Sequence, residues 1–312
     1  MNRRTFLSTA AVVGASALSG CLSMLPLSDS NTSLPDVPTG AWTQYGADET
    51  NSFTTTVSAP SQGNLAWTSE AFTRWQPVVS NGTVYTTNFD PSHDGSAIAL
   101  DAQDGTEQWR TTLDASGENA TIVVDDRCIV GYDSELVALD VQTGERVWTE
   151  PTNGFEHLVA DVDGAPSLVA FSLADGSNRW QRELTAAPES VAPVATQEGV
   201  FVSDDRTLVV HDRDTGDRIR ELHSFGEDGD VPPRTVAVDG GTVFATGSYG
   251  AVAVDSDTGT ERWHRDTPVY KPGICVGSET VVFPIGNPEF SPGKKTISAF
   301  GRESGEMRWH YS

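Results

Sequence analysis

The chain has 312 residues, of which 44 are acidic and 20 basic, and its net charge is −24. Only three residues are lysines, namely Lys271, Lys294 and Lys295. The sequence has no basic patch that could replace the counterions of a nucleic acid, so this composition disfavours nucleic acid and other phosphate-rich partners. The length allows one large all-β domain or two smaller ones.

The first twenty residues are predicted to be an export signal that lies outside the fold. Arg3 and Arg4 precede an apolar stretch that ends at Leu18 and is too short to span a bilayer comfortably. This segment resembles a twin-arginine signal. The residues up to Cys21 resemble a lipobox, which implies lipidation of Cys21. An uncleaved anchor, or cleavage elsewhere that leaves Cys21 as a free thiol, are the alternatives.

Residues 21–40 are rich in Ser, Thr and Pro and have no periodicity, which predicts a disordered tether before a folded domain of residues 41–312. Signal and tether together predict a protein anchored by lipid on the extracellular face of the cytoplasmic membrane. The acidic, lysine-poor composition resembles that of secreted proteins from salt-adapted archaea, in which salt screens the self-repulsion of the chain. We therefore expect loss of stability at low salt, and an acidic mesophilic protein is the alternative.

An eleven-residue unit, Ala253–Trp263 (AVDSDTGTERW), recurs along the chain. It has a small residue first, Asp third, Gly seventh and Trp eleventh, which predicts a β-hairpin with an Asp-capped turn. Clear copies end at Trp109 and Trp148. The weaker copies end at Trp180, Arg220 and Trp309, and a degenerate first copy covers residues 57–67.

The copies lie 32 to 46 residues apart and are separated by alternating apolar segments. This period predicts a single all-β propeller of four-stranded antiparallel blades, whereas no 3.6-residue periodicity supports a helical solenoid. We expect seven blades, with an incomplete N-terminal blade and a short third blade, and six or eight blades are alternatives. A blade cannot cover its own two apolar faces, so each Trp is expected to pack on the neighbouring blade.

Turn residues predict the strands within the blades. In the first full blade the predicted turn is Asn81–Gly82. The strands predicted around it cover residues 77–80, 83–88, 97–102 and 106–111.

Two blades depart from this scheme. Between Trp148 and Trp180 only residues 157–161 and 166–171 can form strands before the final hairpin, so one strand of the third blade is expected to be missing or merged with another. The chain ends three residues after its last Trp. Either residues 42–68 fill the remaining blade alone, or the ring is incomplete.

The A-x-D-x-x-x-G-x-x-x-W unit resembles the tryptophan docking repeat of pyrroloquinoline-quinone-type (PQQ-like) propellers. The resemblance covers about residues 42–312. The family includes quinoprotein alcohol dehydrogenases and non-catalytic lipoproteins of the outer-membrane assembly factor type. The resemblance is therefore highly specific for the fold. It is only weakly specific for the function, because the shared residues are structural.

The resemblance implies that a dehydrogenase of this family clamps the quinone with a disulfide between adjacent cysteines and binds calcium through Glu, Asn and Asp. The cysteines here are Cys21, Cys128 and Cys275, with no adjacent pair, so the clamp is absent. Cys128 and Cys275 are interpreted as small buried hydrophobic residues. The turn at residues 255–259 lacks the ligand spacing of a calcium loop. We therefore expect neither PQQ nor calcium, and no catalytic or metal-binding residue is predicted.

The longest loops are predicted to emerge on one face of the propeller. Trp75, Tyr270 and Phe290 lie in these loops and are candidate anchors for a partner, because aromatic loop residues are frequent binding hot spots. The alternative is that they pack between blades or over the channel.

The three glycosylation sequons are at Asn31, Asn81 and Asn119.

These patterns favour a secreted, lipid-anchored, non-catalytic scaffold or binding module at the cell surface, with a protein or cell-envelope partner. The alternative is a quinone-dependent oxidoreductase of the same fold that holds its cofactor through other contacts.

Overall fold

A computed structural model of the chain contains strands and turns. Contacts divide it into two compact units, unit 1 (residues 1–45 and 55–149) and unit 2 (residues 46–54 and 150–312). Within the described residues there is no helix whose length and apolarity would let it span a membrane. The structure describes residues 41–43, 46–48, 51–54, 65–71, 73, 76–88, 95–113, 120–132, 135–151, 155–156, 159–162, 165–185, 193–225, 235–247, 250–266, 269, 273–285 and 296–311.

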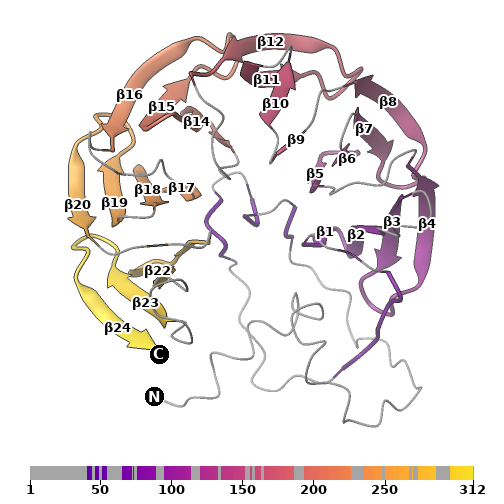
Figure 1. Cartoon of the computed structure of the whole chain (residues 1–312). Coiled ribbons are helices and arrows are strands. Elements are labelled where there is room, and N and C mark those ends of the chain that lie inside the picture. Colours follow the sequence, from indigo (N-terminus) through magenta and orange to yellow (C-terminus); the bar gives the residue numbers. More distant parts are fainter. Residues whose placement is uncertain are drawn as a thin grey trace. The chain divides into compact units, whose positions relative to one another are not determined.

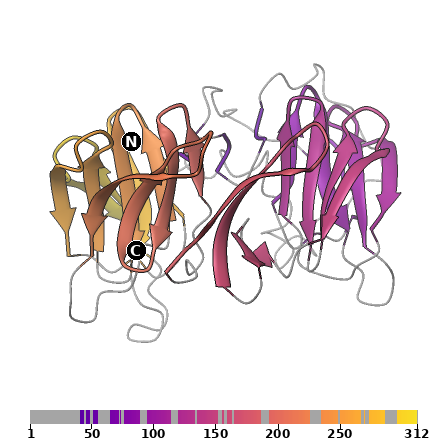
Figure 2. The same ribbon diagram turned by 90° about the horizontal axis from the view of Figure 1, so that it is seen from above.

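Unit 1 contains two four-stranded antiparallel sheets whose strands pair in chain order (Figure 1). The first sheet consists of β1 (Val78–Ser80), β2 (Thr83–Asn88), β3 (Ser96–Asp101) and β4 (Glu107–Thr112). The second sheet consists of β5 (Ala120–Val124), β6 (Arg127–Tyr132), β7 (Glu135–Asp140) and β8 (Arg146–Pro151). Figure 2 shows the strong twist of these strands.

Unit 2 contains four more sheets of the same kind. The third sheet consists of β9 (Phe155–Glu156), β10 (Val159–Val162), β11 (Ala165–Phe171) and β12 (Asn178–Glu183), and the fourth of β13 (Val194–Thr196), β14 (Gly199–Asp204), β15 (Thr207–His211) and β16 (Arg218–Ser224). The fifth sheet consists of β17 (Thr235–Asp239), β18 (Thr242–Gly247), β19 (Gly250–Asp255) and β20 (Glu261–Arg265), and the sixth of β21 (Cys275–Val276), β22 (Thr280–Ile285), β23 (Thr296–Gly301) and β24 (Met307–Tyr311).

The predicted all-β architecture of four-stranded antiparallel sheets is confirmed, and the strands of the first sheet start and end within one residue of their predicted bounds. Asn81 and Gly82 both have positive φ, 49° and 76°, as the predicted tight hairpin turn requires. The prediction that the third blade lacks a strand is wrong. A two-residue strand, β9, pairs with β10 and completes that sheet.

The described residues between 42 and 54 pair with the first strands of other sheets, and the alternative in which residues 42–68 fill a blade alone stays a prediction. In unit 1, Trp42 forms an antiparallel bridge with Val79 of β1. In unit 2, the carbonyl of Ser52 accepts a hydrogen bond of 2.8 Å from the Val276 amide of β21. This segment therefore covers the edges of first strands.

Consecutive sheets within a unit share buried apolar clusters. One cluster joins the first and second sheets through residues such as Tyr85 and Leu139. In unit 2, comparable clusters join the third to the fourth sheet, the fourth to the fifth, and the fifth to the sixth. Burial between sheet faces therefore holds each unit together.

A tryptophan on the fourth strand of one sheet docks on the glycine turn of the next. The indole of Trp263 packs on Gly305, where an added Cβ would lie only 2.7 Å from the ring. Gly305 has φ +62°, so both the conformation and the space there require glycine. The indole Nε1 also donates a 2.7 Å hydrogen bond to the carbonyl of Arg302. One side chain thus contributes both apolar burial and a satisfied polar contact.

The same pair of contacts recurs, which confirms the predicted packing of Trp on the neighbouring blade. Each indole donates to the carbonyl that lies three residues before its glycine, over distances of 2.8 to 3.1 Å. The three further pairs are Trp67 with Gly105, Trp109 with Gly144, and Trp180 with Gly216.

Removing one of these indoles is expected to destabilise the fold strongly. Trp263→Ala leaves a cavity and an unsatisfied carbonyl at Arg302, so we expect a loss of about 3–5 kcal/mol in the free energy of unfolding. Urea unfolding followed by circular dichroism measures it. Trp309→Ala is the matched control, because Trp309 is 39% exposed whereas Trp263 is 5% exposed. Equal losses for the two variants would contradict the docking interpretation.

Candidate functional site

The residues predicted from the sequence to bind a partner or lipid, namely Trp75, Tyr270, Phe290 and Cys21, lie outside the described residues. Two of the three sequons, Asn31 and Asn119, also lie outside them. Asn81 is described and is exposed in the β1–β2 turn. The candidates for a site are therefore the polar clusters and the exposed surfaces of the described sheets.

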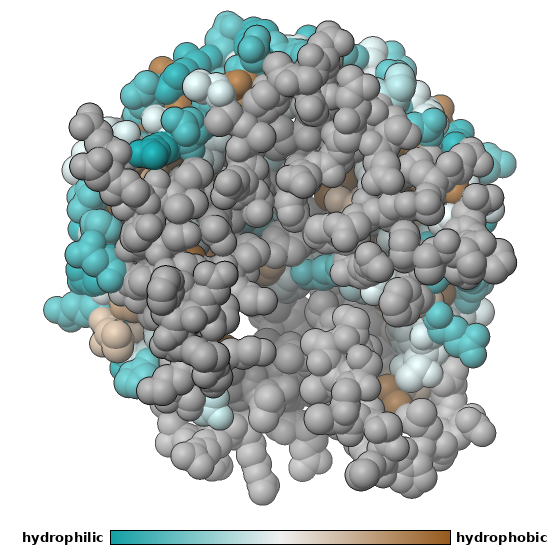
Figure 3. All heavy atoms as spheres, in the orientation of Figure 1, coloured by the Kyte–Doolittle hydropathy of each residue, from teal (hydrophilic) through white to brown (hydrophobic). Residues whose placement is uncertain are grey.

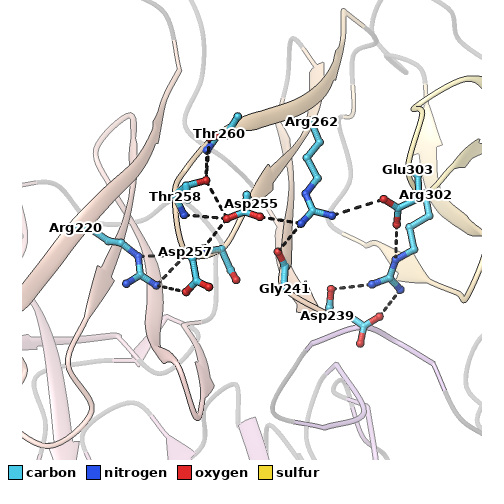
Figure 4. Close-up of polar contacts among 11 residues, drawn as sticks. Arg220, Asp239, Gly241, Asp255, Asp257, Thr258, Thr260, Arg262, Arg302 and Glu303 are labelled. Carbon is cyan, nitrogen blue, oxygen red and sulfur yellow. Dashed lines mark hydrogen bonds and ion pairs between the residues drawn. The ribbon is translucent and has the colours of Figure 1, made fainter.

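The densest polar cluster joins the fourth, fifth and sixth sheets in unit 2, and Figure 4 shows its guanidinium and carboxylate groups pointing toward one another. Arg262 donates to Asp255 Oδ2 at 2.9 Å and lies 3.6 Å from Glu303. Arg302 pairs with Asp239 and also donates to its backbone carbonyl at 2.8 Å. The Arg262–Asp255 bond lies within the fifth sheet, whereas the contacts of Arg262 with Glu303 and of Arg302 with Asp239 connect the fifth sheet to the sixth.

Asp255 is the predicted turn cap, and the structure confirms this role. Its Oδ1 accepts hydrogen bonds from the amides of Asp257 and Thr258 at 3.1 and 2.9 Å. The hydrogen bond from Arg262, followed by those from Thr258, holds the pKa of Asp255 far below its usual range. The same backbone bonds lower the pKa of Asp140 and Asp212 in the equivalent turns. These carboxylates therefore cap the turns in which they lie.

The expectation that the chain binds neither PQQ nor calcium stays a prediction. The described residues contain no group of three or more His, Cys, Asp and Glu side chains that could hold a metal ion. Burial raises the pKa of Cys128 to about 12, so this thiol stays protonated at neutral pH. Cys128 is buried, as predicted, whereas Cys275 is only partly buried, and neither forms a disulfide.

Large apolar side chains are exposed mainly on the last sheet. Four of the eight such residues in the described part of the chain lie on β23 and β24, namely Ile297 (37% exposed), Met307 (56%), Trp309 (39%) and Tyr311 (69%). We call these four residues the β24 face. The described residues in the view of Figure 3 are mostly hydrophilic, so a cluster of exposed apolar groups is unusual for this surface.

Sequence reasoning missed the β24 face, although the repeat carries a signal for it. Two residues before the Trp position of the repeat, the degenerate first copy has Leu65 and the next five have Glu, Arg or Asn, whereas the last copy has Met307. Two residues after it, the other copies have Ser, Thr, Glu, Arg or Leu, whereas the last copy has Tyr311. Alignment of the copies would therefore have singled out the last strand as more apolar than the rest.

Comparisons with known families and proteins identify what the chain resembles. The family profile described as "Outer membrane protein assembly factor BamB" matches residues 54–159 and 151–272. The chain is 26% identical over 177 residues to BamB of Taylorella asinigenitalis, covering 49% of this chain and 45% of that protein. It is 29% identical over 160 residues to BamB of Burkholderia pseudomallei, covering 43% and 40%. The chain therefore spans less than half the length of these relatives.

Solved structures show the same fold. The crystal structure of BamB from Moraxella catarrhalis aligns with a TM-score of 0.53 at 15% identity, covering 79% of this chain and 75% of that one. A europium-containing methanol dehydrogenase aligns with a TM-score of 0.55 at 9% identity, covering 87% and 78%. At such identities the likeness confirms the predicted β-propeller fold and carries no information on activity.

Acid is expected to weaken the turn capped by Asp255. Because its pKa is lower in the folded than in the unfolded chain, the ionised carboxylate stabilises the fold above about pH 4, and this contribution is lost as the pH falls further. Asp255→Asn should therefore lower the thermal midpoint at pH 7, and the difference from the parent should shrink progressively below about pH 4.

The control for this experiment is Glu198→Gln, which changes an exposed carboxylate that accepts no hydrogen bond among the described residues. It should leave the midpoint nearly unchanged across the same pH range. A constant difference between Asp255→Asn and the parent at all pH values would show that charge on Asp255 plays no part.

Proposed function

We propose, on the premise that this chain belongs to the BamB family of PQQ-like β-propellers, that it is a non-catalytic binding scaffold of the cell envelope. The observation that carries the proposal is that the repeat residues have structural roles, whereas the last sheet exposes other side chains. The Asp, Gly and Trp residues of the repeat serve turn and sheet docking, and the last sheet exposes the β24 face. A scaffold needs a rigid framework and an exposed contact surface, and these residues supply both.

The relatives support a role in assembling other proteins, since both carry the name of an outer-membrane protein assembly factor. For this chain we propose a protein or cell-envelope partner. We do not propose the particular complex of those relatives. We also propose that the chain holds neither PQQ nor calcium, because the Cys128 thiol is buried, the Cys275 thiol donates to the carbonyl of Phe53, and the Asp255 carboxylate caps its own turn.

The anchoring of the scaffold is part of the proposal. Lipid on Cys21 and the tether of residues 21–40 would hold the propeller on the extracellular face of the cytoplasmic membrane after twin-arginine export. The excess of negative charge supports a salt-rich exterior, where screening limits self-repulsion.

Replacing the lipidated residue is expected to release the protein from the membrane. Cys21→Ala removes the thiol that would carry the lipid, so the protein should move from the membrane fraction to the soluble fraction when cells are fractionated. Cys275→Ala is the matched control, because it removes a thiol within the sixth sheet and should leave the distribution unchanged. Retention of Cys21→Ala in the membrane fraction would instead indicate an uncleaved anchor.

Partner capture tests the binding role directly. Crosslinking in intact cells at high salt, followed by purification of the full chain, should recover a defined envelope protein. The triple variant Trp75→Ala, Tyr270→Ala, Phe290→Ala should lose most of that partner if the loop aromatics are its anchors.

Ile219→Ala is the control for this capture, since it removes an exposed apolar side chain from the fourth strand of the fourth sheet. An unchanged partner set in the triple variant would remove the loop aromatics from the proposal. A quinone and calcium that copurify with the chain would contradict the non-catalytic role itself.

A further inference from the structure

Residues 46–48 and 51–54 form a compact loop in unit 2, and we call these residues the strap. The amide of Phe53 donates a 2.9 Å hydrogen bond to the carbonyl of Gly46, which closes the loop. Asn51 packs so closely on Gly46 that a Cβ has no room there. The two ends of the strap are therefore in contact, and the strap docks as one unit.

The strap lies on the first strands of the fifth and sixth sheets, β17 and β21, each of which is an edge strand of its sheet. The carbonyl of Ser52 accepts from the amide of Val276 in β21 at 2.8 Å. Asn51 Nδ2 donates to the carbonyl of Val236 in β17 at 2.6 Å. Backbone groups at a sheet edge are a template for pairing, so the docked strap occupies positions that an added strand would use.

The strap also buries side chains against unit 2. Asn51 and Ser52 are 6% and 4% exposed, and Phe53 packs on the apolar cluster between the fifth and sixth sheets. The thiol of Cys275 in β21 donates to the carbonyl of Phe53 at 3.4 Å. Burial raises the pKa of this thiol, so it is protonated and poorly reactive while the strap is docked.

Backbone strain opposes these contacts. Ala47, Asn51 and Phe53 have φ angles of +83°, +54° and +53°, in the left-handed region that costs free energy for a residue with a Cβ. Asn tolerates this region better than most residues, whereas Ala and Phe do not. The strain is relieved when the loop leaves the sheets and opens. Docking of the strap is therefore a balance between its contacts and its strain.

We propose that the strap is a releasable cover of the β17 and β21 edges, which leaves them while the sheets stay folded. Its contacts hold it and its strain favours departure, so the docked and released forms exchange by local opening. Release frees the Val276 amide and the Val236 carbonyl to pair with an extended strand. The strap thus controls access to two sheet edges. This inference goes beyond the proposed scaffold function and does not rest on it.

Chemical labelling of Cys275 measures release of the strap, because its thiol contacts the Phe53 carbonyl. The assay uses the purified full chain with Cys21→Ala in high salt, so that Cys128 and Cys275 are the two remaining thiols. Iodoacetamide is added, and mass spectrometry follows each site. We expect slow labelling of Cys275 at a rate that low concentrations of urea leave unchanged, while Cys128 stays unlabelled. This pattern is typical of local opening.

Variants of the strap shift the balance in both directions. Ala47→Gly should slow labelling of Cys275 several-fold, because glycine adopts positive φ without strain. Phe53→Ala and Asn51→Ala remove docking contacts and should speed labelling at least about tenfold. Ile219→Ala, which changes an exposed side chain of the fourth sheet, is the control and should leave the rate unchanged. The second thiol is buried, and its lack of labelling shows that each variant remains folded.

Three results would overturn the proposal. Joint labelling of Cys275 and Cys128, with the urea dependence of global unfolding, would show that the strap does not leave separately. Labelling of Cys275 in the parent as fast as that of a small free thiol would show that the strap does not cover the edge. Equal rates in the three strap variants and the parent would show that neither contacts nor strain set the docked state. Because the assay needs no partner, its failure leaves the proposed scaffold function untouched.

Discussion

The structure depends on one contact, in which an indole lies flat on a glycine turn and donates to a carbonyl of that turn. A β-sheet of four strands has two apolar faces and cannot bury them alone, so a repeat of such sheets is stable only when each sheet is fixed on its neighbour. Apolar burial alone is not directional and would allow neighbouring sheets to slide. The hydrogen bond from Trp263 to Arg302, 2.7 Å long, and the lack of space for a Cβ at Gly305 fix the register between two sheets.

The fourth sheet shows which part of this contact is essential. It has Arg220 in place of Trp, and the guanidinium donates to the carbonyl of Ser256 through Nε at 3.2 Å and Nη2 at 2.8 Å. That carbonyl occupies the same place in the turn as the acceptors of the indoles. The apolar half of the contact is replaced, since the backbone of Leu222 lies over Gly259 where other sheets have an aromatic ring. The donor and the glycine are therefore retained, while the group that covers the glycine varies.

Much of the fold could be predicted from the sequence because its signals are local. Alternating apolar residues and the Asn81–Gly82 turn fix the strands of the first sheet, and the spacing of Trp, Asp and Gly fixes the docking contact. The third sheet was less predictable because β9 is two residues long and is held by pairing with β10, for which no local pattern exists. The β24 face was missed for a related reason. The exposure of a strand depends on which other elements pack against it in space, and the apolar residues of β24 do not by themselves show whether they are covered.

The composition and the contact surface are consistent with each other. In the salt-rich surroundings that a net charge of −24 suggests, ion pairs on the surface are strongly screened and contribute little to binding. Apolar contacts are not weakened in this way, and excluded salts strengthen them. A protein of this composition would therefore recognise a partner better through aromatic rings and neutral hydrogen bonds than through charged side chains. Met307 and Tyr311, which are 56% and 69% exposed, are side chains of this kind, and Trp263 fixes the turn of the sheet that carries them through its hydrogen bond to the carbonyl of Arg302.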